Sequence, residues 1–385
     1  MSKPDQFVLR LPADTQALMA EGARQMGICN SCRYCEGYCA VFPAMERRLE
    51  FHGTDLNYLA NLCHSCGECY YACQYSPPHE FAIHIPQLLG AIRAKTYRQY
   101  AWPAPLANLF DSNGLFVAVA LMAGIAAILL LATLFAGNGA ALAEARPDGS
   151  FYAVIPHTAM AGVFGLVGLF VLVALLAGFM KFWRDAGENL AEFTRPFALA
   201  ETLKDIATLK YLDGDSQVGC TYPGEQPSQA RRWFHHLTFY GFLLCFAATL
   251  VGTLYHYGFG WQAPYGFYSL PVLLGTLGGI GLAIGPAGLW WLKVRQDPLT
   301  ASPEQAGMDI AFIALLILTS LSGLALLAGR ESQWMGSLLI LHLGAVMALF
   351  ISLPYGKFVH GIYRGAALVK YALERRRPGL DLGGD

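Results

Sequence analysis

Residues 29–39 read CNSCRYCEGYC and residues 63–73 read CHSCGECYYAC, so the cysteine spacing C-x2-C-x2-C-x3-C occurs twice. In this pattern three cysteines wrap a loop around one iron–sulfur cluster, and the fourth ligates the cluster of the other motif. The chain is therefore expected to hold two 4Fe–4S clusters. The expected ligands are Cys29, Cys32, Cys35 and Cys73 for the first cluster, and Cys63, Cys66, Cys69 and Cys39 for the second.

Zinc and disulfides are the alternative uses of these cysteines. Paired C-x2-C units build four-cysteine zinc sites, but zinc leaves the third and fourth cysteine of each run without a role. Disulfides need an oxidising compartment, whereas the charge distribution places this segment in the cytoplasm. Cys220 and Cys245 have no partner at ligand spacing and are interpreted as free thiols. Between the motifs, residues 44–62 show helical apolar spacing, which favours a helical ferredoxin.

The composition indicates a membrane protein. Of the 385 residues, 55% are hydrophobic and 14% are charged, with a formal net charge of −1. Nothing in this balance argues for nucleic acid as a partner. Six mostly uncharged runs reach the roughly 20 residues that cross a bilayer. They cover about 115–136, 154–180, 233–257, 267–292, 308–328 and 337–356.

Positive charge is concentrated on one side of these runs. Of the 26 Lys and Arg residues, all but Arg146 and Arg330 lie before the first run, after the last run, or in every second loop. By the positive-inside rule, both termini then face the cytoplasm of a bacterial inner membrane. The expected fold is all-α: a helical dicluster ferredoxin domain over 1–110, a six-span cytochrome b-like bundle over 111–362, and a basic cytoplasmic tail over 363–385.

Histidines recur near the ends of the third and sixth spans, where ionisable groups usually have a function. His342 and His360 are 18 residues apart. On one continuous helix they would share a face and stand about 27 Å apart. His256 is expected at the depth of His342, and His235 or His236 at the depth of His360. These pairs predict two haem b sites, and the helical angle from His256 favours His235 over His236.

Other interpretations of the histidines remain open at this stage. Any one of them could be an interfacial residue that hydrogen-bonds among the helices. His157, at the outer end of the second span, is a third candidate for the outer haem or a donor at a quinone site. The glycine-rich stretch 275–288 lies within an apolar run and follows no strand, so close helix packing explains it better than nucleotide binding.

The cytoplasmic loop 181–232 is long enough to serve as a docking surface. It is expected to be helical over 185–210 and irregular after that. The sequence does not contain the strand–glycine-rich loop–helix motif that is typical of a flavin or nicotinamide site. Two-electron chemistry is therefore assigned to a partner protein, and this chain is expected to act as an electron-transfer subunit rather than to carry catalytic residues.

Three segments resemble the tricarballylate-utilisation protein B family, also called the citrate-utilisation CitB family. They are CRYCEGYCAVFPAMERR (32–48), LANLCHSCGECYYACQYSPPHEFAI (59–83) and RRWFHHLTFYGFLLCFAATL (231–250). The resemblance implies a membrane iron–sulfur partner of an FAD-dependent tricarballylate dehydrogenase, which sends electrons to the quinone pool. A related fusion protein of cobalamin synthesis carries flavin, haem and clusters. The membrane half also resembles the nitrate-reductase gamma-type cytochrome b in its 18-residue histidine spacing.

The resemblance implies a relay from flavin through the clusters and haem b to quinone, with tricarballylate oxidised to cis-aconitate by the partner. Three alternatives stay open. The chain could be a haem-free, membrane-anchored ferredoxin, or it could serve another flavoenzyme, such as one of cobalamin synthesis. A redox-sensing permease would instead show polar, broken helices near the midplane, whereas these spans are polar mainly at their ends.

Overall fold

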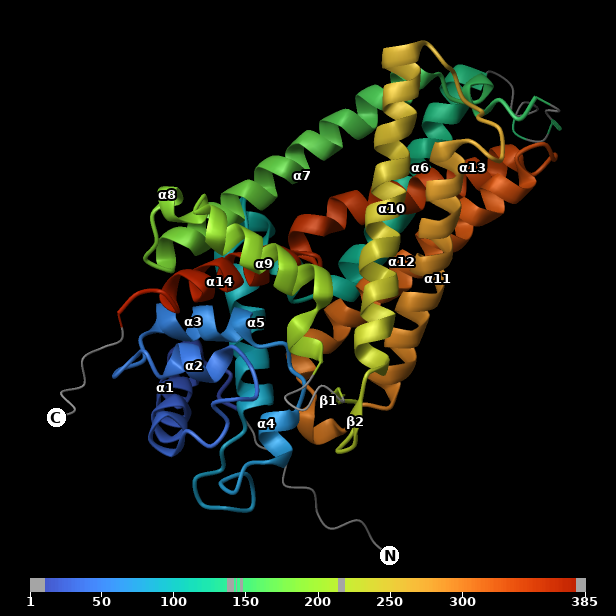
Figure 1. Cartoon of the computed structure of the whole chain (residues 1–385). Coiled ribbons are helices and arrows are strands. Elements are labelled where there is room, and N and C mark those ends of the chain that lie inside the picture. The colour runs from blue at the N-terminus through green and yellow to red at the C-terminus, as the bar shows by residue number, and fades with distance from the viewer. Residues whose placement is uncertain (1–10, 137–141, 143, 146–147, 214–218, 379–385) are drawn as a thin grey trace, which may run out of the picture.

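The computed structural model describes residues 11–136, 142, 144–145, 148–213 and 219–378. Almost all of these residues with regular structure are helical (Figure 1). The strands in the described ranges are β1 (Cys220–Thr221) and β2 (Pro227–Ser228), which form one short antiparallel hairpin. The all-α expectation is therefore confirmed.

The described part of the N-terminal domain, from residue 11 on, contains five α-helices and both cysteine motifs. They are α1 (Thr15–Cys32), α2 (Val41–Met45), α3 (Gly53–Leu62), α4 (Glu68–Tyr71) and α5 (Ile85–Tyr100). The Asp14 side chain caps α1 by accepting from the Ala17 N–H, and Arg33 ends this helix with a left-handed backbone at φ 55°. Cys63 is the residue that ends α3. The first motif thus begins in the last turn of α1, which holds Cys29 and Cys32, and the second begins at the residue that ends α3. Cys35 and Cys39 follow α1 outside any helix, whereas Cys69 lies on the short helix α4.

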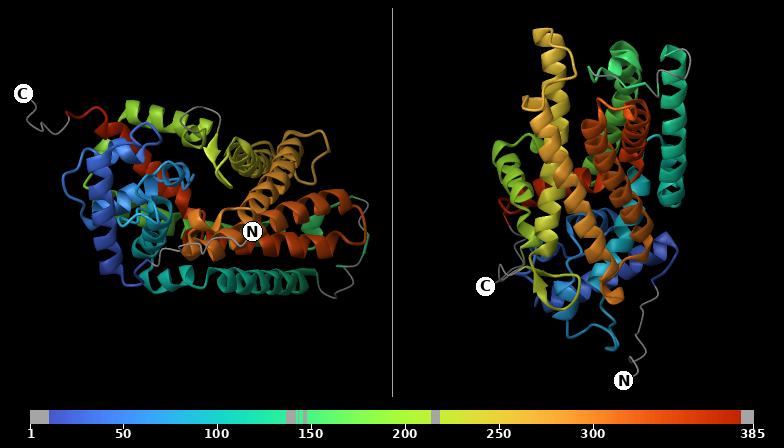
Figure 2. Two further views of the ribbon diagram at one scale, coloured as in Figure 1. Left: turned by 90° about the horizontal axis from the view of Figure 1, so that it is seen from below. Right: turned by 90° about the vertical axis from the view of Figure 1, so that its right-hand side faces the viewer.

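Among the residues that the structure describes, six helices are long and apolar enough to cross a membrane. They are α6 (Asn113–Ala136), α7 (His157–Asp185), α10 (Ala230–Phe259), α11 (Leu270–Val294), α12 (Pro303–Gly329) and α13 (Met335–Ser352). In the bundle, α11 packs between α10 and α12, and α13 packs between α12 and α6 (Figure 2). Leu166 on α7 and Leu250 on α10 are among many large apolar side chains that stay exposed. Such faces are stable in lipid rather than in water.

Short elements connect the long helices. They are η1 (Ala104–Phe110), η3 (Phe151–Ala153), α8 (Leu190–Phe193), α9 (Pro196–Thr208), η4 (Lys210–Leu212), η5 (Pro298–Thr300), η6 (Leu353–Tyr355) and α14 (Val359–Glu374).

Glycines let α10 and α11 pack closely. A Cβ atom added at Gly278 would lie 2.8 Å from the backbone N of Cys245 and the carbonyl O of Gly241. A Cβ atom at Gly285 would lie 2.6 Å from the Thr238 N. Small residues at a helix interface allow backbones to approach in this way. The interpretation of residues 275–288 as a packing segment is confirmed.

We expect Gly278→Leu to separate α10 from α11. Overpacking a tight contact costs about 1–3 kcal/mol. The midpoint of thermal unfolding in detergent should fall clearly. Gly162→Leu on α7 is the matched control, since a Cβ at Gly162 meets no atom within 4 Å. Equal midpoints for the two variants would contradict the packing role.

The sixth span and the helix that carries His360 are not continuous. Helix α13 ends at Ser352, η6 follows, and α14 begins only at Val359. Pro354 lies in the break, and proline cannot donate the N–H that a continuing helix requires. The expectation that His342 and His360 share one helix face is therefore wrong.

Helix α14 is part of the core rather than a solvated tail. Its residues Tyr363, Ala367 and Val369 belong to the same buried cluster as Leu59 of α3 and Phe182 of α7. Figure 1 shows α14 between the N-terminal domain and α9. The expectation of a basic tail from residue 363 is wrong over the described residues up to Glu374, because every third or fourth side chain of this segment is apolar or small and is buried against a neighbouring helix.

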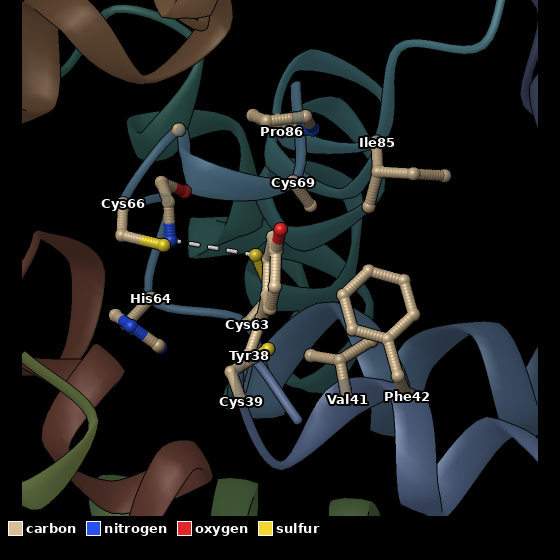
Figure 3. A pocket seen from close by; sticks show the side chains of 12 residues that line it. Tyr38, Cys39, Val41, Phe42, Cys63, His64, Cys66, Cys69, Ile85 and Pro86 are labelled. Carbon is tan, nitrogen blue, oxygen red and sulfur yellow. Dashed lines mark hydrogen bonds between the residues drawn. The ribbon is translucent and has the colours of Figure 1, made fainter. Parts of the chain in front are cut away.

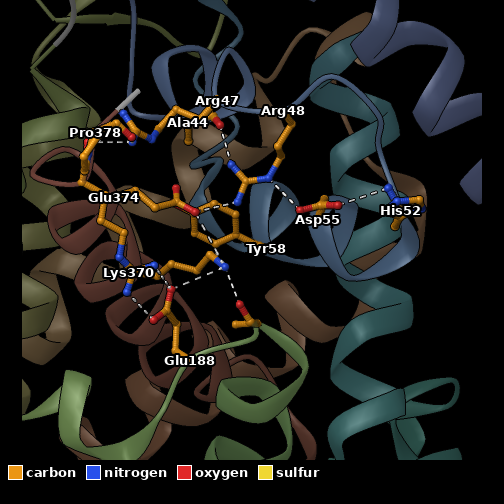
Figure 4. A network of polar contacts seen from close by, with 12 residues as sticks. Ala44, Arg47, Arg48, His52, Asp55, Tyr58, Glu188, Lys370, Glu374 and Pro378 are labelled. Carbon is orange, nitrogen blue, oxygen red and sulfur yellow. Dashed lines mark hydrogen bonds and ion pairs between the residues drawn. The ribbon is translucent and has the colours of Figure 1, made fainter. Parts of the chain in front are cut away.

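A buried ion network fixes the end of α14 to the N-terminal domain (Figure 4). Glu374 accepts from Arg48 at 2.7 Å and from the Tyr58 hydroxyl at 3.0 Å. Lys370 lies 3.6 Å from Glu374 and 3.8 Å from Glu188. Burial lowers the pKa of Lys370, and the carboxylate of Glu374 opposes that shift.

Removing the Glu374 charge should weaken this junction. Breaking one partner of a buried ion pair costs about 3–5 kcal/mol. We expect Glu374→Gln to lower the thermal unfolding midpoint of the detergent-solubilised protein. The control is Glu50→Gln, since the Glu50 side chain is 84% exposed and lies 4.0 Å from His52. If both variants unfold at the wild-type temperature, the network does not hold the junction.

Candidate functional site

The eight motif cysteines line two separate cavities in the N-terminal domain. One, of about 220 Å³, is lined by Cys29, Cys32, Cys35 and Cys73. The other, a narrow space of about 10 Å³, is lined by Cys39, Cys63, Cys66 and Cys69 (Figure 3). Each cavity thus receives three cysteines from one motif and one from the other.

The donor set fits a multi-iron cluster better than a single ion. Within the described residues, no three His, Cys, Asp or Glu side chains converge closely enough to hold one metal ion. A cubane separates its four thiolates more widely than zinc does. Burial raises the pKa of the Cys29 thiol to about 12 and that of Cys66 well above its usual range. Thiolates in these cavities therefore need a positive centre between them.

The two cavities differ in exposure. The four cysteines of the first cavity are all partly exposed, and Tyr34 on its rim is 66% exposed. In the second cavity Cys63 and Cys66 are buried, whereas Cys39 and Cys69 are partly exposed. The first cavity is therefore the more exposed of the two.

The cover of the second cavity comes from the long middle loop. A Cβ atom at Gly67 would lie 3.0 Å from the Thr221 carbonyl O. Asp297, between α11 and α12, joins the loop to the domain: its N–H donates to the Pro223 carbonyl at 2.8 Å, and its carboxylate accepts from the Tyr71 hydroxyl at 2.8 Å. Cys220 is fully buried in one cluster with Cys66. Cys220 is so far from the two motifs in the sequence that its position beside Cys66 cannot be predicted from the spacing of the cysteines. Part of the loop that was expected to dock a partner protein thus packs against the N-terminal domain of the same chain.

Three arginines bind the loop that carries Cys63 and Cys66. Arg231 donates to the carbonyls of His64 and Ser65, both at 2.9 Å. Arg364 donates to the Cys63 carbonyl at 2.6 Å, and Arg93 donates to that of Ala60 at 2.7 Å. These residues come from α10, α14 and α5.

A larger cavity of about 470 Å³ lies on the membrane side of this loop and contains His235 and His360. Their ring centroids are 6.2 Å apart with planes at 76°. His360 Nδ1 is 2.5 Å from the Lys357 carbonyl O, to which it can donate, and His235 Nδ1 is buried without a hydrogen-bond partner. Two imidazoles that share a metal, each about 2 Å from it, have centroids roughly 6 Å apart. The centroid separation of this pair therefore matches that of two imidazoles on one metal ion.

Both histidines stand one helical turn from a loop-binding arginine: His235 follows Arg231 on α10, and His360 precedes Arg364 on α14. The cavity is lined by the cations Arg93, Arg231, Lys293, Lys357 and Arg364 and by the anions Asp205 and Asp309. This excess of positive charge suits a ligand with carboxylate groups, such as the propionates of haem.

His236 does not line this cavity. Its ring packs against Trp233 and Tyr240. Sequence reasoning missed Arg93, Arg364 and Lys357. The signal for Arg364 was available, since it repeats on α14 the four-residue spacing that Arg231 and His235 have on α10.

The outer histidines are arranged differently from the expectation. His256 stacks on His157 with ring centroids 3.8 Å apart, which is too close for an iron between them. His342 Nδ1 lies 3.2 Å from the Ser322 hydroxyl on α12. Among the described residues, no ring contact joins His256 to His342. The structure thus brings together the inner pair but not the outer one.

Comparison with known proteins identifies the chain's relatives. The family model for citrate utilization protein B matches residues 112–381, and the model for its Fer4-like domain matches residues 22–99. A curated citrate utilization protein B from Escherichia coli is 52% identical over 358 residues, which are 93% of each chain. This chain belongs to the citrate utilization protein B family. No solved structure matches it.

The Fer4-like match covers all the motif cysteines, and the six apolar helices mark a multi-pass membrane protein. This member of the citrate utilization protein B family is thus a membrane iron–sulfur protein with a role in electron transfer.

Cysteine substitutions distinguish ligands from a neighbouring thiol. We expect Cys66→Ser to lower the iron and acid-labile sulfide content of the anaerobically purified protein by about half, because one of the two predicted clusters would lose a ligand. Cys220→Ser should keep the full content, although Cys220 is buried against Cys66. Iron loss in the Cys220 variant alone would instead make Cys220 a ligand.

Proposed function

We propose that this protein accepts electrons from a reduced FAD-dependent dehydrogenase of tricarballylate or a similar tricarboxylate and delivers them to quinone, using two 4Fe–4S clusters and haem b. The name of the Escherichia coli relative refers to citrate utilization, which is consistent with a tricarboxylate as the dehydrogenase's substrate. The concentration of Lys and Arg on one side supports an inner-membrane protein with both termini in the cytoplasm.

One observation carries the proposal: the loop of Cys63 and Cys66 is joined by Arg231 and Arg364 to the helix turns that present His235 and His360. Four residues of an α-helix span only about 6 Å. The second cysteine cavity and the histidine pair are therefore neighbours, connected by short runs of protein. An anchor that merely held a ferredoxin at the membrane would not need this connection.

The exposed first cavity is the proposed entry point for electrons. Its partly exposed cysteines allow a partner flavoprotein to approach closely. Reduced flavin carries two electrons, and each iron–sulfur cluster accepts one, so two clusters convert a pair into single transfers. The buried second cavity then lies between the entry point and the membrane helices.

His235 and His360 are the residues proposed to hold haem b. The hydrogen bond to the Lys357 carbonyl fixes the His360 ring with Nε2 left for a metal. Haem b in this position would take up and release one electron at a time. Lys293 and Lys357, which both pair with Asp309 at 2.6 Å, are the cavity cations proposed to bind its propionates. A second haem at His256 and His342 stays a prediction that this geometry does not favour.

Histidine variants test the haem site. His235→Ala and His360→Ala should each abolish the pyridine haemochrome signal assigned to this site, because one of the two histidines proposed to hold the haem is lost. His236→Ala is the matched control on the adjacent residue and should retain the signal. Iron and acid-labile sulfide at about eight per chain, the content of two 4Fe–4S clusters, should persist in all three.

Wild-type protein with about eight non-haem irons and no haem would reduce the function to that of an anchored ferredoxin. A second assay measures quinone reduction by membranes that are supplied with the reduced dehydrogenase. An electron relay and an anchored ferredoxin should both support quinone reduction, whereas a permease should not.

A further inference from the structure

The three loop-binding arginines place positive charge around one of the two cysteine sets. Besides the bonds given above, Arg364 Nε is 3.3 Å from the Asn61 carbonyl, and Arg93 Nη1 is 3.2 Å from the Ser65 hydroxyl. All of these bonds end within residues 60–65, on either side of Cys63. The partners are carbonyl and hydroxyl oxygens, and within the part of the chain that the structure describes no carboxylate forms an ion pair with these three guanidinium groups.

These charges are also shielded from water. The Arg93 residue is 3% exposed, and the Arg231 guanidinium stacks over the Tyr222 ring at 4.4 Å from its centroid. Charges in such surroundings are screened by solvent and salt much less than surface charges are.

The first cysteine set has different surroundings. Arg24 is paired with Glu21 at 2.6 Å, and Arg48 is paired with Asp55 at 2.7 Å. Arg33, next to Cys32, donates to the Asn30 carbonyl on the exposed surface. Positive charge near this set is therefore neutralised by carboxylates or screened by solvent.

Reduction of a 4Fe–4S cluster adds one negative charge to it. Nearby buried cations stabilise the reduced form, and cluster potentials respond to local charge, hydrogen bonds and exposure. Resting on the function proposed above, we infer that Arg93, Arg231 and Arg364 raise the reduction potential of the cluster held by Cys39, Cys63, Cys66 and Cys69 above that of the other cluster. Electron transfer from the exposed cluster to the buried one is then downhill.

The test is an EPR-monitored redox titration of the detergent-purified, full-length protein. Wild-type protein should show two reducible clusters with separate midpoint potentials. Arg231→Gln and Arg364→Gln each remove one positive charge. Each variant should lower the midpoint potential of the higher-potential cluster by at least 59 mV, which for one electron is a tenfold change in the reduction equilibrium. The lower potential should stay unchanged. Arg231→Lys restores the charge and should restore the higher potential.

Arg33→Gln is the matched control, since Arg33 lies beside the exposed set, and it should change neither potential. An unchanged higher potential in the Gln variants, or equal shifts of both potentials, would overturn the inference. Loss of the second cluster from both Gln variants would also overturn it, because the arginines would then be purely structural. Wild-type protein without two reducible clusters would instead refute the proposed function itself.

Discussion

The hydrogen bonds from Arg93, Arg231 and Arg364 to the backbone around Cys63 are the contact on which the arrangement of this protein depends. Carbonyl groups in a buried loop need donors, and an unsatisfied one costs about 1–3 kcal/mol. Here the donors come from three helices that are far apart in the sequence. One short loop therefore sets the position of the N-terminal domain, the third span and the last helix relative to each other.

This junction explains why the histidines of α10 and α14 meet. A helix is rigid over one turn, so fixing Arg231 and Arg364 on the same loop also fixes His235 and His360 four residues away. The close glycine packing of α10 on α11 adds a second constraint on His235. The pair is thus held by backbone contacts on two sides.

Much of the fold follows from the sequence because it depends on local patterns. Apolar runs predict the spans, and the cysteine spacing groups Cys73 with Cys29 and Cys39 with Cys63. The choice of His235 over His236 uses the helical angle, and in the structure His235 lines the cavity. Contacts between residues far apart in the sequence could not be predicted from such local patterns. Nothing local shows that Cys220 lies beside Cys66, or that α14 is buried against α3.

The helix break at Pro354 also has a consequence for biogenesis. It turns α14 away from the sixth span and against the N-terminal domain. There Glu374 accepts from Arg48, and Arg364 donates to the Cys63 carbonyl. Domains generally fold in the order of their synthesis. Here the first domain lacks one wall of its core until a helix that follows all six spans has been made. Completion of this core is therefore coupled to synthesis of the whole membrane region, because α14 supplies residues of the same buried cluster.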